Sequence, residues 1–329
     1  MKKYLIFLLL SLVAVSCYED YIFDYEYTGI YFPYQYDVRT FVVGEGMKIE
    51  VGAALGGVRE NTMDRTVDFS FDGSLVSAAS LYQMQNLSSE YIRTATASVA
   101  ALELLPATHY TISNASQMVI KEGKHVGTVV VRADSLAFVT DPKSMVATYV
   151  LPFRIDEAEA DSVVKAKNFN VVAFKYENML FGKYWHGGAT VRLDSVGTII
   201  DTIRYDTQIP TPESKIWVLT TTSPNTVVTN AFSNQASMPN SQLALTLNGG
   251  TITLASAPGS TYTFTPDGAS TYNQAKLLQE RKLYLKYQYT MMVGLKTRYC
   301  HATDTLTFRN RIRDGINEWQ DENPSNYLK

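Results

Sequence analysis

One short run of aromatic and hydrogen-bonding residues is the leading candidate for a ligand site. Tyr184, Trp185 and His186 are followed directly by two glycines, which let a ligand approach the backbone closely. A sugar ring offers apolar C–H patches and a belt of hydroxyl groups, so an exposed aromatic ring flanked by polar side chains suits it. Trp217 and Trp319 are further carbohydrate-binding candidates. Each ring also has a competing interpretation, as a core residue or, for Trp319, as a residue that pins the tail.

The residues that could support catalysis or metal binding lack the necessary spacing. The carboxylates of Asp156, Glu157, Glu159 and Asp161 suggest glycoside hydrolysis, but they follow a predicted strand, where a solvated acidic loop is expected. The histidines show no HExxH motif or close ligand spacing, and we expect surface or turn positions for them: His109, His125, His186 and His301. Nucleophile-elbow, P-loop, dinucleotide and EF-hand patterns are absent, although a Ser-His-Asp triad assembled in space stays open. We predict no catalytic residue, no metal, no cofactor and no enzymatic activity.

The elements that must position these residues are predicted to be β-strands. Val67, Phe69 and Phe71 alternate with polar neighbours, which places the apolar set on one face of a strand. The longest alternating strand, residues 283–289, leaves aromatic residues on both of its faces. A barrel or a strongly curved sheet would give those two faces different neighbours.

Local patterns predict three further features. Residues 118–120 and 126–131 flank a turn in which Gly123 can adopt a positive φ, so we expect a hairpin. Pro152, inside an apolar strand, indicates an edge strand or a bulge. Only residues 74–85 have helical spacing of their apolar side chains.

The first seventeen residues resemble a bacterial lipoprotein signal peptide. Two lysines precede an apolar run of about 12 residues, which suits a signal peptide and is too short for the ~20 residues of a membrane span. We expect residues 1–16 to be removed and Cys17 to be lipidated; ordinary secretory cleavage near Ser16 is the alternative. Glu19 and Asp20 resemble the acidic signal that directs Bacteroidetes lipoproteins to the outer face of the outer membrane.

Composition narrows the classes of partner. Hydrophobic residues make up 46% of the chain and charged residues 19%, which is enough to bury a sizeable core. Loss of Lys2 and Lys3 with the signal changes the net charge from -3 to -5, since two positive charges leave. The absence of a Lys/Arg cluster argues against nucleic acid and against membrane contact other than the lipid anchor. With Cys17 lipidated, only Cys300 remains, which excludes an intrachain disulfide and a cysteine zinc site.

Two domains are predicted after a tether of residues 17–27. Residues 28–177 form a first β-unit, and the composition then shifts towards Thr, Ser and Asn in residues 178–329, which hold all three tryptophans. The residues 105–110, 119–123 and 149–153 make the first unit similar to the immunoglobulin-like N-terminal domain of many Bacteroidetes surface lipoproteins. In that family the domain also precedes endoglycosidases, but their DxxDxDxE motif is absent here.

The second unit resembles the non-catalytic C-terminal domains of the same family, through residues 181–188 and 305–319. The resemblance implies an all-β protein: an immunoglobulin-like β-sandwich followed by a β-rich domain, for which a lipocalin-like barrel is one architecture. It also implies a glycan-binding surface lipoprotein of a polysaccharide-uptake system, with an outer-membrane transporter and its partner lipoproteins as partners. An adhesin or structural protein that contacts host or partner proteins is the alternative, and a glycoside hydrolase is the third.

Overall fold

The computed structural model describes residues 27–205, 209–212, 214–235 and 237–321. The chain divides into two compact units. The first holds the described residues up to Phe41 and those of Met47–Lys175, and the second holds Val42–Gly46 and the described residues from Tyr176 onward. The main division thus falls two residues before the predicted boundary, and the separate segment Val42–Gly46 is not predicted by the sequence.

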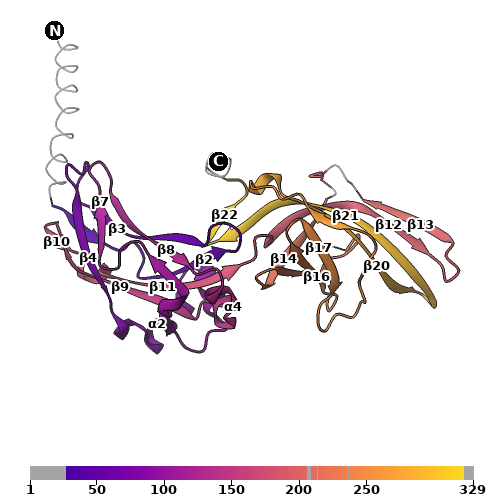
Figure 1. Ribbon diagram of the computed structural model, residues 1–329, viewed down its shortest axis with the longest axis horizontal. Coiled ribbons are helices and arrows are strands. Elements are labelled where there is room, and N and C mark those ends of the chain that lie inside the picture. Colours follow the sequence, from indigo (N-terminus) through magenta and orange to yellow (C-terminus); the bar gives the residue numbers. More distant parts are fainter. Residues whose placement is uncertain (1–26, 206–208, 213, 236, 322–329) are drawn as a thin grey trace, which may run out of the picture. The chain divides into compact units, whose positions relative to one another are not determined.

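The first unit is a β-sandwich of two sheets (Figure 1). One sheet has the order β10 (Ser162–Val163), β1 (Gly29–Tyr31), β3 (Lys48–Gly56), β8 (Val126–Ala133) and β6 (Tyr110–Ile112). The other has the order β2 (Tyr36–Val42), β11 (Phe169–Glu177), β9 (Tyr149–Ala158), β4 (Arg65–Phe71) and β7 (Gln117–Ile120), and β5 (Glu103–Leu104) pairs with β9. The expected all-β class is confirmed.

The core of the sandwich follows the alternation in the sequence. On β4, Val67 and Phe69 are almost completely buried, as the pattern predicts. The ring of Phe153 on β9 lies 5.3 Å from that of Phe69 and 6.3 Å from that of Phe32, which directly follows β1. Aromatic contacts therefore join the two sheets.

The predicted hairpin of residues 118–131 is wrong, although Gly123 does adopt a positive φ of 72°. Strand β7 pairs with β4, whereas β8 pairs with β3 and β6 in the other sheet. The chain therefore crosses from one sheet to the other at this turn. A Cβ on Gly127 would lie 2.7 Å from the backbone of Val119, so the glycine permits a close crossing.

Pro152 does not mark an edge strand, because β9 pairs with β11 on one side and with β4 on the other. The Pro152 carbonyl accepts a hydrogen bond from the Asp72 backbone N–H at 2.9 Å. The proline nitrogen faces the same side, where β4 has ended at Phe71. A central strand tolerates this proline because no ladder hydrogen bond is lost.

The described residues of the first unit form three short α-helices, of which the sequence pattern predicts only the first: α2 (Ala78–Asn86), α3 (Glu90–Thr96) and α4 (Ala137–Thr140). The helix predicted at residues 74–85 starts later because Ser77 caps it by accepting a hydrogen bond from the Ser80 N–H. Leu81 and Met84 bury the inner side of α2. None of the helices in the described ranges has the length and hydropathy that crossing a bilayer requires.

The second unit is built on one large sheet that closes on itself. Its strands are β12 (Gly182–Leu193), β13 (Ile199–Tyr205), β14 (Lys215–Ser223), β15 (Thr226–Thr229), β16 (Leu243–Asn248), β17 (Thr251–Ser256), β18 (Thr265–Pro266), β19 (Ser270–Tyr272), β20 (Lys282–Val293), β21 (Lys296–Arg313) and β22 (Ile316–Glu318). Consecutive antiparallel pairings run from β12 through β14–β17 to β19–β21, and β21 pairs back with β12. The second unit is therefore an up-and-down β-barrel, as the lipocalin-like interpretation predicts.

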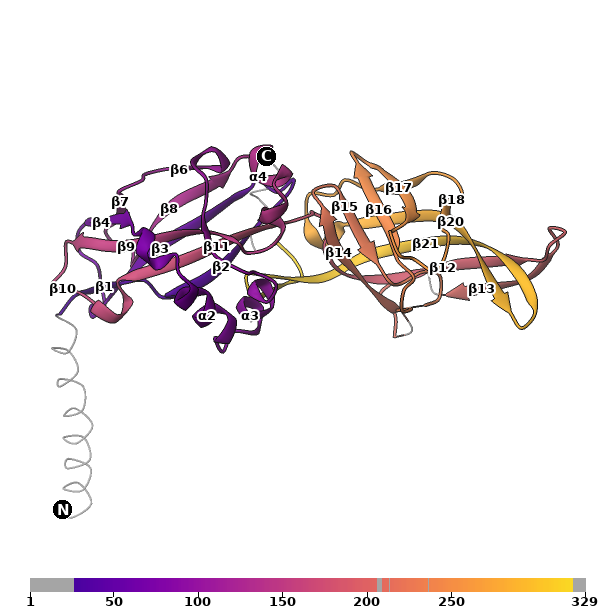
Figure 2. The same ribbon diagram turned by 90° about the horizontal axis from the view of Figure 1, so that it is seen from below.

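Large side chains occupy the inside of this barrel. On β20, Leu283, Leu285 and Tyr287 are completely buried while Tyr284 is 45% exposed, so the alternation along this strand puts aromatic rings on both faces. Strands β12 and β13, and β20 and β21, continue past the shorter barrel strands as long hairpins (Figure 2).

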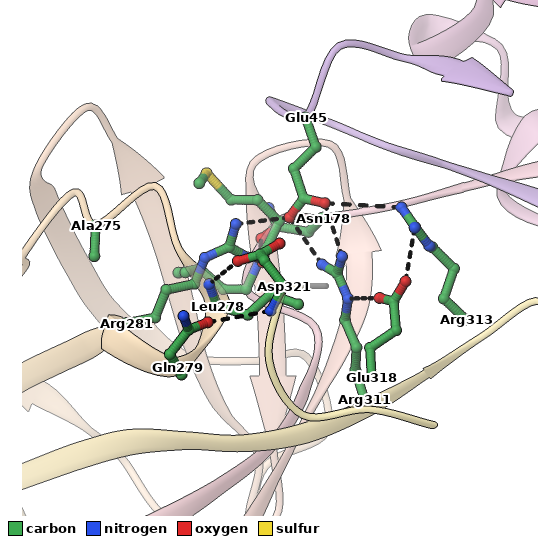
Figure 3. Close-up of polar contacts among 12 residues, drawn as sticks. Glu45, Asn178, Ala275, Leu278, Gln279, Arg281, Arg311, Arg313, Glu318 and Asp321 are labelled. Carbon is green, nitrogen blue, oxygen red and sulfur yellow. Dashed lines mark hydrogen bonds and ion pairs between the residues drawn. The ribbon is translucent and has the colours of Figure 1, made fainter. Parts of the chain in front are cut away.

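A buried ion cluster holds the segment Val42–Gly46 in the second unit (Figure 3). Glu45 Oε1 accepts hydrogen bonds from Arg281 Nη2 at 2.7 Å and Arg311 Nη1 at 2.8 Å, and Oε2 accepts one from Arg311 Nη2 at 2.7 Å. Glu318 pairs with Arg311 and Arg313, both at 2.6 Å. Burial by itself would raise the pKa of Glu45, but Arg311 and Arg281 outweigh it and lower this pKa to about 2.

Candidate ligand-binding groove

The predicted platform of Tyr184, Trp185 and His186 does not exist as one surface. Along β12 successive side chains point to opposite faces, so Tyr184 and His186 lie inside the barrel and Trp185 lies outside. Tyr184 and His186 are 0% and 1% exposed. The prediction that these three residues form an exposed sugar platform is wrong, as is the expected surface position of His186.

The two remaining tryptophans lie in different environments. Trp217 is completely buried, and its indole stacks on the His186 ring with a centroid distance of 4.4 Å. It is therefore a core residue and not a surface binding residue. Trp319 is 59% exposed beyond β22, and the Arg309 guanidinium lies 4.9 Å from the Trp185 ring on the outer face. The predicted aromatic residues are thus divided between the core and separate surface positions.

A polar layer lies inside the barrel around Asp304. Asp304 Oδ1 accepts a hydrogen bond from Tyr205, and Oδ2 accepts one from Tyr287, both at 2.6 Å. His186 Nε2 is 3.1 Å from Asp304 Oδ1, within ion-pair distance, although neither ring nitrogen makes a hydrogen bond in the described structure. Burial and the negative charge of Asp304 raise the pKa of Tyr287 well above its ordinary value.

This polar layer is not open to a ligand in the structure. The side chains of His186 and Asp304 have no solvent exposure, and the Trp217 and Tyr205 rings pack against His186. A barrel of eight strands is just wide enough for side chains to fill its interior. Accessible hollows of the second unit lie instead on the outer face of the sheet.

The strand register brings a set of polar residues and one tyrosine together on that outer face. Leu193 on β12 pairs with Tyr299 on β21, which pairs with Thr290 on β20. In the adjacent row His301 pairs with Gln288. Directly paired residues point to the same face, and Tyr299, which is 43% exposed, alternates with the buried Cys300.

Two hollows adjoin the Tyr299 side chain, and we call them together the Tyr299 groove. The first has a volume of about 380 Å³ and is lined by Thr263, Thr265, Gln288, Tyr289, Thr290, Tyr299 and Cys300. The second has a volume of about 260 Å³ and is lined by Leu193, Asp194, Ser195, Gly197, Tyr299 and His301. An aromatic ring thus stands between hydroxyl, amide, carboxyl and imidazole groups.

Hydrogen bonds fix the polar groups of the second hollow. Asp194 Oδ1 accepts hydrogen bonds from the backbone N–H groups of Val196 at 3.0 Å and Thr198 at 2.9 Å. These bonds lower the pKa of Asp194, the bond from Thr198 most strongly. His301 Nδ1 lies 2.8 Å from Asp267 Oδ2. The groove is therefore lined by side chains that are held in place before any ligand binds.

Sequence reasoning missed Tyr299, although the signal was present. Cys300, Ala302, Leu306 and Phe308 alternate with more polar residues and are all buried on β21. Because Tyr299 is adjacent to Cys300, the same alternation places it on the outer face. What the sequence does not contain is the position of residues 263–265 and 193–197 on either side of it.

The acidic residues 156–161 are solvated, as the sequence predicts, but Asp156 and Glu157 belong to β9 and not to a loop. Asp161 accepts hydrogen bonds from the backbone and side chain of Thr28, at 2.7 and 2.6 Å, and Glu159 accepts one from the Thr66 N–H. All four carboxylate residues are exposed. Across the parts of the chain that the structure describes, no group of three acidic, histidine or cysteine residues could hold a metal ion.

Comparisons with known proteins identify a shared fold. A family model for a "-like, N-terminal domain" matches residues 23–162. A crystal structure of a protein of unknown function from Bacteroides ovatus is 20% identical, with a TM-score of 0.63, over 90% of this chain and 97% of that one. A multidomain protein including DUF1735, also from Bacteroides ovatus, is 12% identical, with a TM-score of 0.41, over 89% of this chain and 100% of that one. No curated protein matches the chain.

The class of protein follows from the fold and the first of these structures. The chain is an all-β protein with a β-sandwich and a β-barrel, a fold that it shares with a Bacteroides protein of unknown function.

Proposed function

We propose that this protein is a non-catalytic lipoprotein of the outer-membrane surface that captures glycan through the Tyr299 groove. The observation that carries the proposal is an exposed tyrosine between two hollows lined mainly by hydrogen-bonding side chains. The apolar face of a sugar ring packs on the tyrosine ring, and the hydroxyl groups of the sugar bond to Thr, Gln and Ser side chains. Tyr299 thereby replaces the buried residues Tyr184 and His186 in the binding role.

The proposed localisation at the cell surface rests on the sequence alone. Cys17, Glu19 and Asp20 lie outside the described residues, so their proposed roles in lipidation and export follow from the resemblance to lipoprotein signals. A lipid anchor at Cys17 would hold the glycan-binding barrel at the cell surface, where an outer-membrane transporter and its partner lipoproteins take up the captured chain.

The proposal is tested by screening the lipid-free chain from Tyr18 onward against a polysaccharide panel. We expect at least one glycan to bind, and Tyr299→Ala to abolish that binding. Tyr284→Ala is the matched control, because Tyr284 is a tyrosine of similar exposure, 45%, that lines neither hollow. Loss of binding in both variants, or in neither, would refute the role of Tyr299.

One observation favours the second candidate, an adhesin or structural protein that contacts other proteins. The turns of the β12–β13 and β20–β21 hairpins expose apolar side chains, with Leu295 98% and Val196 83% exposed, and β13 is an edge strand. Such a protein would lose its partner when Leu295 and Val196 become Asp and would be indifferent to Tyr299→Ala. A hydrolase, the third candidate, would release new reducing ends from a bound glycan.

A further inference from the structure

We infer that the ligand of the Tyr299 groove is an uncharged glycan chain that crosses the Tyr299 ring and occupies both hollows at once. This inference rests on the proposed function and adds the length and charge of the ligand.

The two hollows adjoin in a way that suits a chain of linked sugars and not a single sugar ring. They share one lining residue, Tyr299, and lie towards opposite neighbours of β21. The first includes Gln288 and Thr290 on β20, and the second includes Leu193 at the end of β12. Because neighbouring strands are about 4.8 Å apart, the groove spans about 10 Å from β12 to β20. A single sugar ring cannot reach both ends of it, whereas a linked chain can.

The residues that line the two hollows favour an uncharged ligand. None of the described residues that line either hollow is a lysine or an arginine. Arg298 is adjacent in sequence to Tyr299 and therefore points to the opposite face of the sheet. Asp194 contributes a carboxylate to the second hollow. The positive charge of Arg298 helps to lower the pKa of Asp194, but a glycan that carries carboxylate or sulfate groups would find no lysine or arginine among the lining residues to pair with.

The two hollows offer different partners to the chain. In the first, the polar side chains that face outward are the hydroxyls of three threonines and the Gln288 amide, whereas the buried Tyr289 alternates with them and faces the interior of the barrel. In the second, Ser195 and His301 lie beside Asp194, which can only accept hydrogen bonds when ionised. A chain with hydroxyl groups along its length can donate to Asp194 at one end and exchange hydrogen bonds with Gln288 at the other.

The experiment is calorimetric titration of the lipid-free chain from Tyr18 onward with the glycan found in the panel, with its oligosaccharides of increasing length and with its monosaccharides. Thr265→Trp and Ser195→Trp each place a large side chain at an exposed position of one hollow. We expect either variant to weaken the binding of the longest oligosaccharide by about tenfold or more, equivalent to about 1.4 kcal/mol. Monosaccharides should bind at least about tenfold more weakly than the chain, and so should a carboxylated or sulfated polymer.

The outcomes separate this inference from the proposed function. If a glycan binds and Tyr299→Ala abolishes binding, but one filling variant has no effect or a monosaccharide binds as tightly as the chain, the two-hollow inference is overturned and the proposed function stands. Equal binding of an acidic polymer overturns the charge assignment. If no glycan binds, or if Tyr299→Ala binds normally, the proposed function fails and the inference fails with it.

Discussion

At the scale of single residues, Glu45 has the clearest electrostatic effect on stability, because it forms buried ion pairs with two arginines. Its side chain is 10% exposed, and those of Arg281 and Arg311 are 3% and 2% exposed. Removing one partner of a buried ion pair leaves the others without compensation, which costs about 3–5 kcal/mol. The Glu45 carboxylate therefore stabilises the folded second unit by compensating the charges of Arg281 and Arg311.

We expect Glu45→Gln to lower the free energy of unfolding of the second unit by about 3–5 kcal/mol, because Arg281 and Arg311 stay buried. Tryptophan fluorescence follows this unit selectively, since all three tryptophans belong to it. Asp201→Asn, which breaks a more exposed ion pair with Arg192 in the same unit, should change the denaturation midpoint little. Equal midpoints for Glu45→Gln and Asp201→Asn would contradict this account.

The same residue predicts a pH dependence. The pKa of Glu45 is lowered from 4.5 to about 2 on folding, so its contribution is complete above about pH 4.5 and is lost as the pH falls towards 2. Denaturation of the wild type at pH 6 and pH 3 should show a loss of stability on acidification that is smaller in Glu45→Gln. An identical loss in both proteins would show that other groups are responsible.

The polar layer in the barrel allows a second test at this scale. The Tyr287 hydroxyl donates a hydrogen bond to Asp304 at 2.6 Å and accepts one from the Ser233 N–H at 2.6 Å. Tyr287→Phe leaves both groups buried with one partner fewer, and we expect it to cost about 1–3 kcal/mol in chemical denaturation. Tyr284→Phe, at an exposed position of the same strand, is the control and should unfold like the wild type.

Residue patterns predict which side chains share a face of a strand, but not which of the two faces is buried. Alternation separates Trp185 from Tyr184 and His186 without structural data, and it groups Tyr287 with Tyr289. Which of the two groups lies inside depends on the closure of the barrel, through the pairing of β12 with β21. That pairing joins residues more than a hundred positions apart, so the sequence pattern around residue 185 does not contain it.

At the scale of elements, the passage from β7 to β8 shows where local reasoning fails. A turn with Gly123 flanked by alternating strands predicts a hairpin, yet the two strands belong to opposite sheets. Turn residues determine the local conformation and not the sheet that each strand joins. The same holds for Pro152, whose tolerance depends on where β4 ends.

The crossing between the two sheets predicts an effect of Gly127. We expect Gly127→Ala to destabilise the first unit by about 1–3 kcal/mol, because its Cβ would lie 2.7 Å from the Val119 backbone. Gly73→Ala is the control, since its Cβ would meet no atom within 4 Å. Calorimetric unfolding should show a lower transition temperature for the first variant only. A normal transition in Gly127→Ala would mean that the crossing is not tightly packed.

At the scale of the whole molecule, the all-β class and the main division near residue 176 can be predicted from composition and alternation. The assignment of Val42–Gly46 to the second unit cannot, because it depends on contacts of Glu45 with Arg281 and Arg311, 236 and 266 residues away. Long-range ion pairs of this kind leave no mark on local sequence patterns.

The proposed lipid anchor at Cys17 belongs to the same scale. We expect Cys17→Ala to release the protein from the membrane fraction of the native host, because the proposed lipid anchor is attached to that residue. Cys300→Ala, which changes the other cysteine, should remain membrane-bound. Fractionation with immunodetection measures both, and protease treatment of intact cells reports exposure at the surface. Membrane-bound Cys17→Ala would contradict the proposed lipidation.

Glycan capture by the Tyr299 groove can be tested by a single titration series. The lipid-free wild type, Tyr299→Ala and Tyr284→Ala are titrated with the polysaccharide that binds in the panel, after circular dichroism has shown that all three are folded. We expect the wild type and Tyr284→Ala to bind the polysaccharide and Tyr299→Ala not to bind it. Undiminished binding by folded Tyr299→Ala would contradict glycan capture by this groove.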